Sequence, residues 1–354
     1  MLSVVAISGG VDSSVAAALT ADRAGIAETV GVSLRLYSTD EHASRSGRSC
    51  CAPDDLYDAR RAAAALGIHF YVYDAQERFR TEVIDHFVRS YARGETPNPC
   101  VRCNDEVKFE WLLDRARRLG AGALVTGHYA RIERGADGAW RLLRARDAAK
   151  DQSYFLHGLT QEELAFVQFP LGELTKTQVR AIARSRGLPN ADKPESMEVC
   201  FVAGQPLAAF LETHGVRRTR GEIVDTSGRV LGEHFGVQHF TPGQRRGLGI
   251  SHPLPLYVAS LDVERQRVVV GTRGEVARTS FRALQVSWVA EPPRDDTACE
   301  VQIRHRGRPL PAHVAPASDG SVEVTLQEPA VGVAPGQSAV FYRGDEVLGG
   351  ARIA

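Results

Sequence analysis

The stretch that decides the fold is residues 2–14, which read LSVVAISGGVDSS. The first six residues are mostly apolar and predict a short buried strand. The residues from Asp12 to Ala24 have the Ala-rich amphipathic pattern of a helix. A strand that turns through two glycines into a helix presents backbone N–H groups at the positive end of that helix, which suits pyrophosphate. The stretch therefore predicts a nucleotide loop at the start of an α/β domain.

Within this loop, Gly9 and Gly10 let the backbone approach a phosphate closely, while Asp12 either holds Mg²⁺ or caps the helix. The hydroxyl donors of the loop are Ser8, Ser13 and Ser14. The Walker sequence with its lysine is absent. With no lysine nearby in the sequence, we expect phosphate binding to depend on Gly10 and Asp12. The competing interpretation is an ordinary strand–turn–helix with a serine cap.

Length and composition set the outer limits. The 354 residues predict two or three domains, and 43% hydrophobic with 24% charged residues is typical of a globular protein. The net charge is zero, so any nucleic-acid footprint must be a local patch. The first apolar run is too short for a signal sequence or a membrane span, which predicts a cytoplasmic protein.

Lysine is rare in this chain. Lys108, Lys150, Lys176 and Lys193 are its only lysines among 43 basic residues. In a chain so biased towards arginine, a lysine suggests a position that needs a compact ammonium group, although neutral drift is the alternative.

Strand and helix patterns alternate over the first two hundred residues, which predicts a parallel sheet covered by helices. We expect strands at 2–7, 29–36, 69–73 and 123–126, helices at 12–24, 54–66, 77–93 and 106–119, and a polar loop at 38–49. Short strands parted by Gly and Pro follow, at 221–225, 237–240, 256–261 and 267–271. Alternating runs at 301–303, 322–326 and 339–342 predict a terminal β-barrel. The expected domains are residues 1–203 for nucleotide binding and catalysis, 204–277 as a β-rich middle domain, and 278–354 as a β-barrel.

Three of the six cysteines stand out: Cys100 and Cys103 in a CxxC pair, and Cys200 about a hundred residues later. In a reducing compartment, cysteines are better explained by chemistry than by structural disulfides. The lack of a second CxxC argues against a closed four-thiolate zinc site. Thiols downstream of a pyrophosphate loop indicate sulfur chemistry driven by ATP. The remaining cysteines, Cys50, Cys51 and Cys299, are expected to be bystanders.

The loop resembles the PP-loop of ATP-pyrophosphatases, and the segment TPNPCVRCN at 96–104, continuing to Lys108 and Phe109, resembles the signature of the tRNA-specific 2-thiouridylase family. Further matches to that family fall at 126–129, 150–155, 200–201, 234–250 and 335–337, in order along essentially the whole chain. The resemblance implies thiolation at C2 of the wobble uridine of tRNA. ATP would adenylate the uridine O2, and sulfur from a cysteine persulfide would then displace AMP.

The resemblance also implies residue roles. Cys200 would carry the persulfide and Cys103 would act as nucleophile, with a transient disulfide between them; thiols that react in this way must be close and partly ionised. The implied ATP contacts are Ala6, Ile7, Ser8, Gly9, Gly10, Val11, Asp12, Ser13, Leu34 and Gly127. The implied contacts with the target base are Asn98, Pro99 and Cys100, and those with tRNA are His128, Lys150, Asp151, Gln152, Arg304, His305 and Gln337. The implied cofactors and partners are ATP, Mg²⁺, tRNA, and a cysteine desulfurase or sulfur-relay protein as sulfur donor.

Several alternatives stay open at this stage. Position 100 is Cys where some relatives have Asp, so Cys100, Cys103 and Cys200 could instead hold a 4Fe–4S cluster that carries sulfur. His128 could be a satisfied core histidine, 150–152 a solvated turn, and Arg304 and His305 the ordinary surface of a barrel strand. The rival functions are another adenylating PP-loop enzyme, which would not need the three thiols, and a non-catalytic RNA-binding or nucleotide-binding module.

Overall fold

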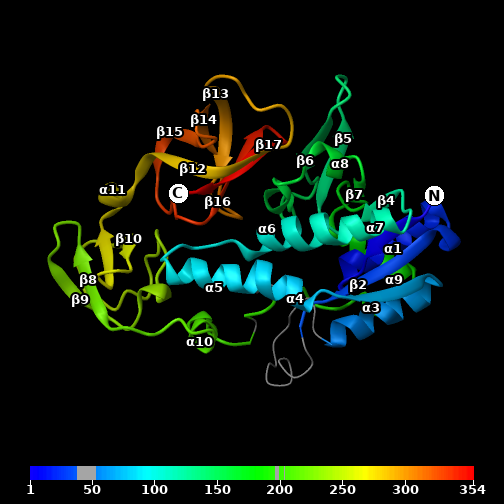
Figure 1. The fold of residues 1–354 in the computed structure, drawn as a ribbon, viewed down its shortest axis with the longest axis horizontal. Coiled ribbons are helices and arrows are strands. Elements are labelled where there is room, and N and C mark those ends of the chain that lie inside the picture. The colour runs from blue at the N-terminus through cyan, green and yellow to red at the C-terminus, as the bar shows by residue number, and fades with distance from the viewer. Residues whose placement is uncertain (38–52, 196–198, 203) are drawn as a thin grey trace. The chain divides into compact units, whose positions relative to one another are not determined.

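The computed structural model describes residues 1–37, 53–195, 199–202 and 204–354. It divides into two compact units (Figure 1). The first unit holds residues 1–84, 99–205 and 345–348, and the second holds 85–98, 206–344 and 349–354. The expected polar loop at 38–49 lies outside the described residues, as do Cys50 and Cys51.

The first unit is built on a five-stranded sheet in the order β3-β2-β1-β4-β7. Its strands are β1 (Ser3–Ala6), β2 (Thr29–Arg35), β3 (His69–Asp74), β4 (Ala123–Val125) and β7 (Val167–Gln168). Every pairing is parallel, which confirms the predicted parallel sheet. The strand order reverses on the two sides of β1, and such a switch point is where α/β sheets bind ligands. The loop after β1 occupies this position.

Both faces of this sheet are covered. Val5 and Val125 point into a core shared with α1 (Val11–Ala24), α3 (Pro53–Leu66) and α9 (Lys176–Ser185). Val4 and Leu124 point to the opposite face, because side chains alternate along a strand, and they are also fully buried. This burial of both faces explains why the strands read as continuous apolar runs.

The remaining elements of the first unit frame the sheet. Its other helices are η1 (Ile26–Glu28), α4 (Gln76–Phe79), η2 (Arg80–Ile84), α6 (Pro99–Cys103), η3 (Asn104–Leu112), α7 (Leu113–Arg118), η4 (Ser153–Leu156) and α8 (Gln161–Leu164). The hairpin β5 (Ala130–Arg134) and β6 (Trp140–Arg144) pairs with the start of β17 (Glu346–Ile353). The expected helix at 106–119 thus begins earlier, at Pro99, so Cys100 and Cys103 lie on a helix.

The second unit contains α5 (Asp85–Ala92), α10 (Leu207–Thr213) and two β structures. One is a four-stranded sheet with the order β10-β11-β8-β9. Its strands are β8 (Gly221–Asp225), β9 (Val230–His234), β10 (Tyr257–Asp262) and β11 (Arg267–Gly271). The helix α11 (Arg273–Val276) follows β11. The remaining strands are β12 (Arg278–Trp288), β13 (Thr297–Gln302), β14 (Leu310–Pro316), β15 (Val322–Ala330) and β16 (Ser338–Arg343). Because β12 pairs with both β15 and β17, the strands from β12 to β17 close into the predicted barrel.

Two local predictions are wrong. The run 237–240 was expected to be a strand but forms the 3-10 helix η5 (Val237–His239), whose Val237 packs into the apolar cluster of the middle sheet. A four-residue apolar run does not distinguish a strand from a helical turn. Arg304 and His305 lie in the turn after β13, not on a barrel strand, because β13 ends at Gln302.

Candidate active site

The loop after β1 has the geometry expected of an anion site. Gly9 has a φ of +81° and Gly10 is the N-cap of α1 with a φ of −81°. A Cβ on Gly9 would lie 2.1 Å from the carbonyl oxygen of Asp55, whereas one on Gly10 would meet only the Ser8 hydroxyl at 3.6 Å. Glycine is therefore sterically required at position 9. The first amides of α1 have no partner inside the helix and remain available to an anion.

The serines of the loop divide into two kinds. The Ser13 and Ser14 hydroxyls are buried and donate to the carbonyl oxygen of Gly10 at 3.1 and 3.0 Å. Ser8 is exposed, and its backbone N–H donates to the Ser13 hydroxyl. The Ser8 hydroxyl lies 3.2 Å from the Ser13 hydroxyl, so the hydroxyls of all three serines help to shape the loop.

Asp12 does not cap the helix, and lysine is not absent from the site. The two carboxylate oxygens of Asp12 accept hydrogen bonds from the Lys176 ammonium at 2.7 and 2.8 Å. The Lys176 ammonium also forms an ion pair with Glu195 at 3.0 Å, and Glu195 pairs in turn with Lys150. Although burial acts in the opposite direction, hydrogen bonds from Lys150 and Lys176 hold the pKa of Glu195 below its ordinary value. The expectation that no lysine serves the loop is wrong.

Lys176 is well placed for a role at a phosphate. It opens α9, where the Thr175 side chain and Gln178 form a capping box that fixes the helix start. Its side chain is only 13% exposed, so the ammonium is held rather than solvated. The scarcity of lysine was the one signal in the sequence that pointed to this residue.

The segment after β4 packs directly on the loop. A Cβ on Gly127 would lie 2.7 Å from the backbone nitrogen of Ser13, so only glycine permits this approach. The Tyr129 hydroxyl donates to Asp12 at 2.8 Å, and burial together with that carboxylate raises the pKa of Tyr129. These contacts bring the expected nucleotide residue Gly127 to the loop. Leu34 lies at the carboxyl end of β2, on the same edge of the sheet.

His128 lies among aromatic rings. Its Nδ1 is 2.7 Å from the Thr126 hydroxyl, and its ring centroid is 5.8 Å from those of Phe109 and Phe169. Burial, with a smaller contribution from the Lys108 charge, lowers the pKa of His128 well below its ordinary value. The side chain is therefore neutral, and its proposed contact with tRNA would be made by an uncharged ring.

Cys200 also lies at this edge of the sheet. The Tyr37 hydroxyl donates to the Cys200 sulfur at 2.8 Å, and Tyr37 follows β2 by two residues. Since the carboxyl ends of parallel strands share one edge, this bond places the Cys200 thiol on the same edge as the nucleotide loop. The next residue, Phe201, is 1% exposed and packs edge-on against Phe79. Nothing in the sequence had singled out Tyr37.

Cys103 is carried by the helical segment that begins at Pro99. Asn104, the next residue, donates to the backbone oxygen of Phe155 at 2.9 Å and accepts from the Lys108 ammonium at 2.9 Å. Phe109, on the same segment, packs against His128 at the edge of the sheet. Cys103 is partly exposed and Cys100 is exposed, so reagents can reach both thiols.

The described residues do not form a metal centre. No three His, Cys, Asp or Glu side chains in that part of the chain come together as ligands. For Mg²⁺ the requirement is smaller, because this ion is commonly held by one or two carboxylates together with substrate phosphates. Asp12, 32% exposed beside the loop, meets that requirement.

The expected tRNA residues of the first unit differ in the hydrogen bonds and ion pairs that their side chains make within the protein. Asp151 accepts hydrogen bonds from the backbone of Ala145 and Ser153 and from Arg144. Gln152 accepts from the backbone N–H of Tyr129. These two residues hold the turn together, while Lys150 points its ammonium to Glu195.

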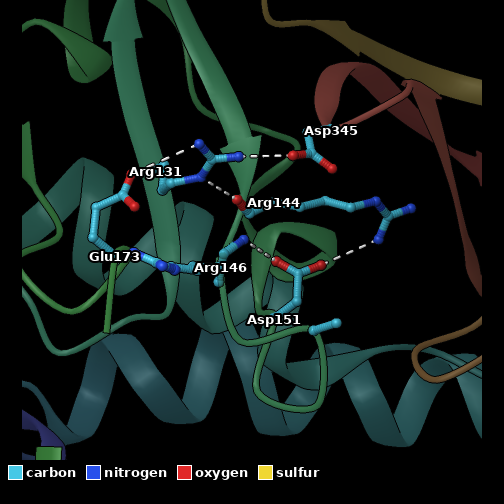
Figure 2. A pocket seen from close by; sticks show the side chains of 8 residues that line it. Arg131, Arg144, Arg146, Asp151, Glu173 and Asp345 are labelled. Atoms are coloured by element: carbon cyan, nitrogen blue, oxygen red, sulfur yellow. Dashed lines mark hydrogen bonds and ion pairs between the residues drawn. The ribbon is translucent and has the colours of Figure 1, made fainter. Parts of the chain in front are cut away.

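A cavity of about 440 Å³ lies beside this turn and is lined by Arg131, Arg144, Ala145, Arg146, Ala148, Asp151, Glu173 and Asp345 (Figure 2). Arg131 pairs with Asp345 at 2.8 Å, and Arg144 pairs with Asp151 at 3.1 Å. The three arginines are balanced by three carboxylates. The cavity is therefore not a cationic site for nucleic acid.

The expected site residues of the second unit form a separate group. Gln337 donates to the backbone oxygen of Thr96 at 2.7 Å, and so holds the segment that contains Asn98. Arg304 is exposed and His305 is partly exposed in the turn after β13. Cys299 lies in the barrel, where burial raises the pKa of its thiol to about 12. Cys299 is thus an unreactive thiol, as expected of a bystander.

Comparisons with known proteins cover the whole chain. Family models match residues 1–204 (tRNA methyl transferase HUP domain), 208–272 (tRNA methyl transferase PRC-barrel domain) and 278–353 (Aminomethyltransferase beta-barrel domain). The tRNA-specific 2-thiouridylase MnmA of Geobacter metallireducens is 50% identical over 98% of this chain and 95% of its own length. The protein of the same name from Acidothermus cellulolyticus is 49% identical over 99% of this chain and 96% of its own.

Among solved structures, the U34-tRNA thiolase NcsA of Methanococcus maripaludis with its 4Fe–4S cluster is 16% identical, with a TM-score of 0.36 over 56% of this chain and 60% of that chain. This likeness is too weak to support any statement about the site. No described helix is both long and apolar enough to cross a membrane.

Proposed function

This chain belongs to the tRNA-specific 2-thiouridylase family, and we propose that it catalyses the ATP-dependent 2-thiolation of the wobble uridine of tRNA, as a tRNA-uridine 2-sulfurtransferase of the cytoplasm. The observation that carries the proposal is the hydrogen bond from Tyr37 to Cys200, which puts a thiol at the same edge of the sheet as the nucleotide loop. A non-catalytic nucleotide-binding module would not need a thiol at that edge. Neither would an adenylating enzyme that transfers nitrogen.

The first step is activation of the uridine. ATP binds with its pyrophosphate at the amides of Gly9, Gly10 and Val11, and contacts residues 6–13, Leu34 and Gly127. The uridine O2 attacks the α-phosphorus, a bond to adenylate forms, and pyrophosphate leaves. Asp12 would hold Mg²⁺ with the nucleotide, and Mg²⁺ would neutralise charge on the leaving pyrophosphate. The Lys176 ammonium lies 2.7 Å from Asp12 and is placed to share that task.

The second step transfers sulfur. A cysteine desulfurase or sulfur-relay protein loads Cys200 with a persulfide, whose terminal sulfur attacks C2 and displaces AMP. The Cys103 thiolate then attacks the Cys200 sulfur and breaks the S–S bond, which leaves 2-thiouridine and a Cys103–Cys200 disulfide. The transferred sulfur gains two electrons and the two thiols lose them. A thiol reductant must restore the enzyme.

The tRNA is proposed to bind through His128, Lys150, Asp151, Gln152, Arg304, His305 and Gln337, with Asn98, Pro99 and Cys100 at the target base. The barrel would contact tRNA, and the domain boundaries at 203 and 277 stay a prediction. Because enzymes that act on a base take it out of its stack, the uridine must leave the anticodon stack to reach the loop. Since phosphate contacts dominate such binding, its affinity should fall steeply with salt despite the zero net charge.

The deciding experiment is mass spectrometry of nucleosides from unmodified tRNA incubated with the protein, ATP, a cysteine desulfurase and cysteine. We expect 2-thiouridine to appear together with AMP and pyrophosphate. AMP formation with a product other than 2-thiouridine would identify another adenylating enzyme. Iron assays after anaerobic purification test the cluster route: an iron-free protein with full activity excludes it, while activity that requires iron would replace the persulfide route.

A further inference from the structure

We propose that Asn190 and Lys193 are positioning residues that orient the Gly9–Gly10 peptide so that its N–H faces the nucleotide. The inference rests on the proposed function only in taking the loop as the pyrophosphate site. The carbonyl oxygen of this peptide accepts hydrogen bonds from two side chains of the segment after α9. Both residues belong to the first unit, as the loop does.

The contacts on this carbonyl are specific. The Asn190 amide donates from Nδ2 to the Gly9 oxygen at 2.9 Å and to the Ser14 hydroxyl at 2.9 Å. The Lys193 ammonium lies 3.3 Å from the same Gly9 oxygen. Asn190 is only 4% exposed, so its donor is not shared with solvent. Two donors, one of them charged, thus fix the direction of a single C=O bond.

The direction of this carbonyl sets the direction of the next amide. In a planar trans peptide the C=O and N–H bonds point to opposite sides. Tying the Gly9 oxygen into the protein therefore turns the Gly10 N–H away from Asn190 and Lys193. Because Gly9 and Gly10 have no side chains and glycine also populates positive φ, neither residue restricts the orientation of this peptide. An external restraint is needed to keep the peptide in one orientation.

Lys193 is itself anchored. Its ammonium donates to Asp55 and Asp58 on α3, and the Asp55 side chain is only 8% exposed. Although burial acts in the opposite direction, these two carboxylates raise the pKa of Lys193 above its ordinary value, so it stays charged. The Asp55 backbone also fills the space where a Cβ on Gly9 would lie. The start of α3 and the segment 190–193 thus enclose Gly9 from two sides.

The first test uses Asn190→Leu, which keeps the branched shape of the side chain and removes the hydrogen bonds from Asn190 to Gly9 and Ser14. This change should not unfold the site, because Oδ1 of Asn190 has no hydrogen-bond partner in the described part of the chain and Ser14 keeps its bond to Gly10. Titration calorimetry with inorganic pyrophosphate should show affinity about tenfold lower than that of the wild type. In the AMP-forming assay, the KM for ATP should rise about tenfold while kcat changes less than threefold.

The second test uses Lys193→Met with Lys193→Arg as the conservative variant. Lys193→Met should weaken pyrophosphate binding, and Lys193→Arg should restore most of it because the charge is kept. Asp192→Asn is the matched control, since Asp192 lies between the two residues but pairs with Arg184 on the surface. The control should bind pyrophosphate and tRNA as the wild type does, and tRNA affinity should be unchanged in every variant.

The outcomes separate this inference from the proposed function. If the folded Asn190→Leu and Lys193→Met variants bind pyrophosphate as tightly as the wild type, the inference is overturned, whatever the enzyme does to tRNA. If the wild type forms no 2-thiouridine but the variants lose pyrophosphate affinity as described, the proposed function fails and the positioning role stands.

Discussion

The nucleotide loop and the surroundings of Cys200 are held by opposite kinds of contact. Around the loop, Lys176 and Lys193 pair with four carboxylates, those of Asp12, Asp55, Asp58 and Glu195. Around Cys200, the contacts include the hydrogen bond from the Tyr37 hydroxyl and the packing of the Tyr37, Phe79 and Phe201 rings. Charge fixes the first region, and apolar packing fixes the second.

The segment that carries Cys103 combines both kinds of contact: Arg102, the residue before it, pairs with Glu82 at 2.8 Å and with Glu106 at 2.7 Å, while nearby titratable groups lose their charge through burial. Burial, with repulsion from Glu106 and Glu163, raises the pKa of Asp105 to about 7, so this carboxyl is protonated for much of its time at neutral pH. Burial lowers the pKa of His157 to about 4, which keeps that ring neutral. A site for pyrophosphate needs fixed charge before the ligand arrives. Thiols need an accessible sulfur that is at least partly ionised. The four predictions below test this contrast.

The largest effect is expected from the thiols themselves. Cys103→Ser and Cys200→Ser should each reduce formation of 2-thiouridine by about a thousandfold or more, because each removes a sulfur that must form or break an S–S bond. ATP binding should stay within about twofold of wild type, since the loop is held by other residues. Nucleoside mass spectrometry and ATP titration measure the two quantities. Cys299→Ser, in the barrel, is the control and should change neither.

The second prediction concerns the steric requirement of the loop. Gly9→Ala should lower the free energy of unfolding by about 3 kcal/mol, because it combines a positive φ with a Cβ 2.1 Å from the Asp55 oxygen. Gly10→Ala, whose Cβ would meet only ordinary contact, should change it by less than about 0.5 kcal/mol. Urea unfolding of both variants measures the difference. Equal destabilisation by both substitutions would contradict the inference that only position 9 requires glycine for steric reasons.

For the nucleotide loop, the sequence predicted the backbone elements correctly but did not show which side chains pair around them. The run LSVVAISGGVDSS predicted the strand, the loop and the helix because the hydrophobic periodicity and the position of the two glycines indicate the same elements. Lys176 and Lys193 lie far along the chain from the loop, so only the rarity of lysine pointed to them. Tyr37 and Phe79 were not predicted, since an aromatic residue after a strand is ordinary core composition. The helix start at Pro99 was missed because the expected helix was placed only from 106 onward.

The third prediction tests, through pH, the burial of the neutral ring of His157 in the first unit. The folded-state pKa of His157, about 4, is below its unfolded value of 6.5. Between these two values the unfolded chain binds more protons, so stability must fall as the pH drops from about 6.5 to about 4. Between pH 7 and pH 4.5, His157→Phe should remove about 2.5 kcal/mol of that acid destabilisation. Urea unfolding at pH 7 and pH 4.5 measures it, and identical pH dependence in the variant and wild type would contradict it.

The smallest effect is expected from Tyr37→Phe, which removes the hydrogen bond from the Tyr37 hydroxyl to Cys200 while keeping the ring against Phe79. A hydrogen bond to sulfur favours the thiolate, so its loss should shift Cys200 towards the neutral thiol and slow its alkylation near pH 7 by about tenfold. The rate of alkylation of Cys200 by iodoacetamide, followed by peptide mass spectrometry across pH, measures this shift.

Two cysteines provide internal references for that experiment. Cys100 is exposed and should be alkylated at the same rate in the wild type and in Tyr37→Phe, while Cys299, with a pKa of about 12, should react little in either. Thiolation at saturating ATP should slow in parallel with alkylation of Cys200, and the KM for ATP should not move, because the loop is held by Lys176 and Lys193 rather than by Tyr37. A rise in that KM would show that the charged and apolar regions are coupled, and that the contrast between them is not functional.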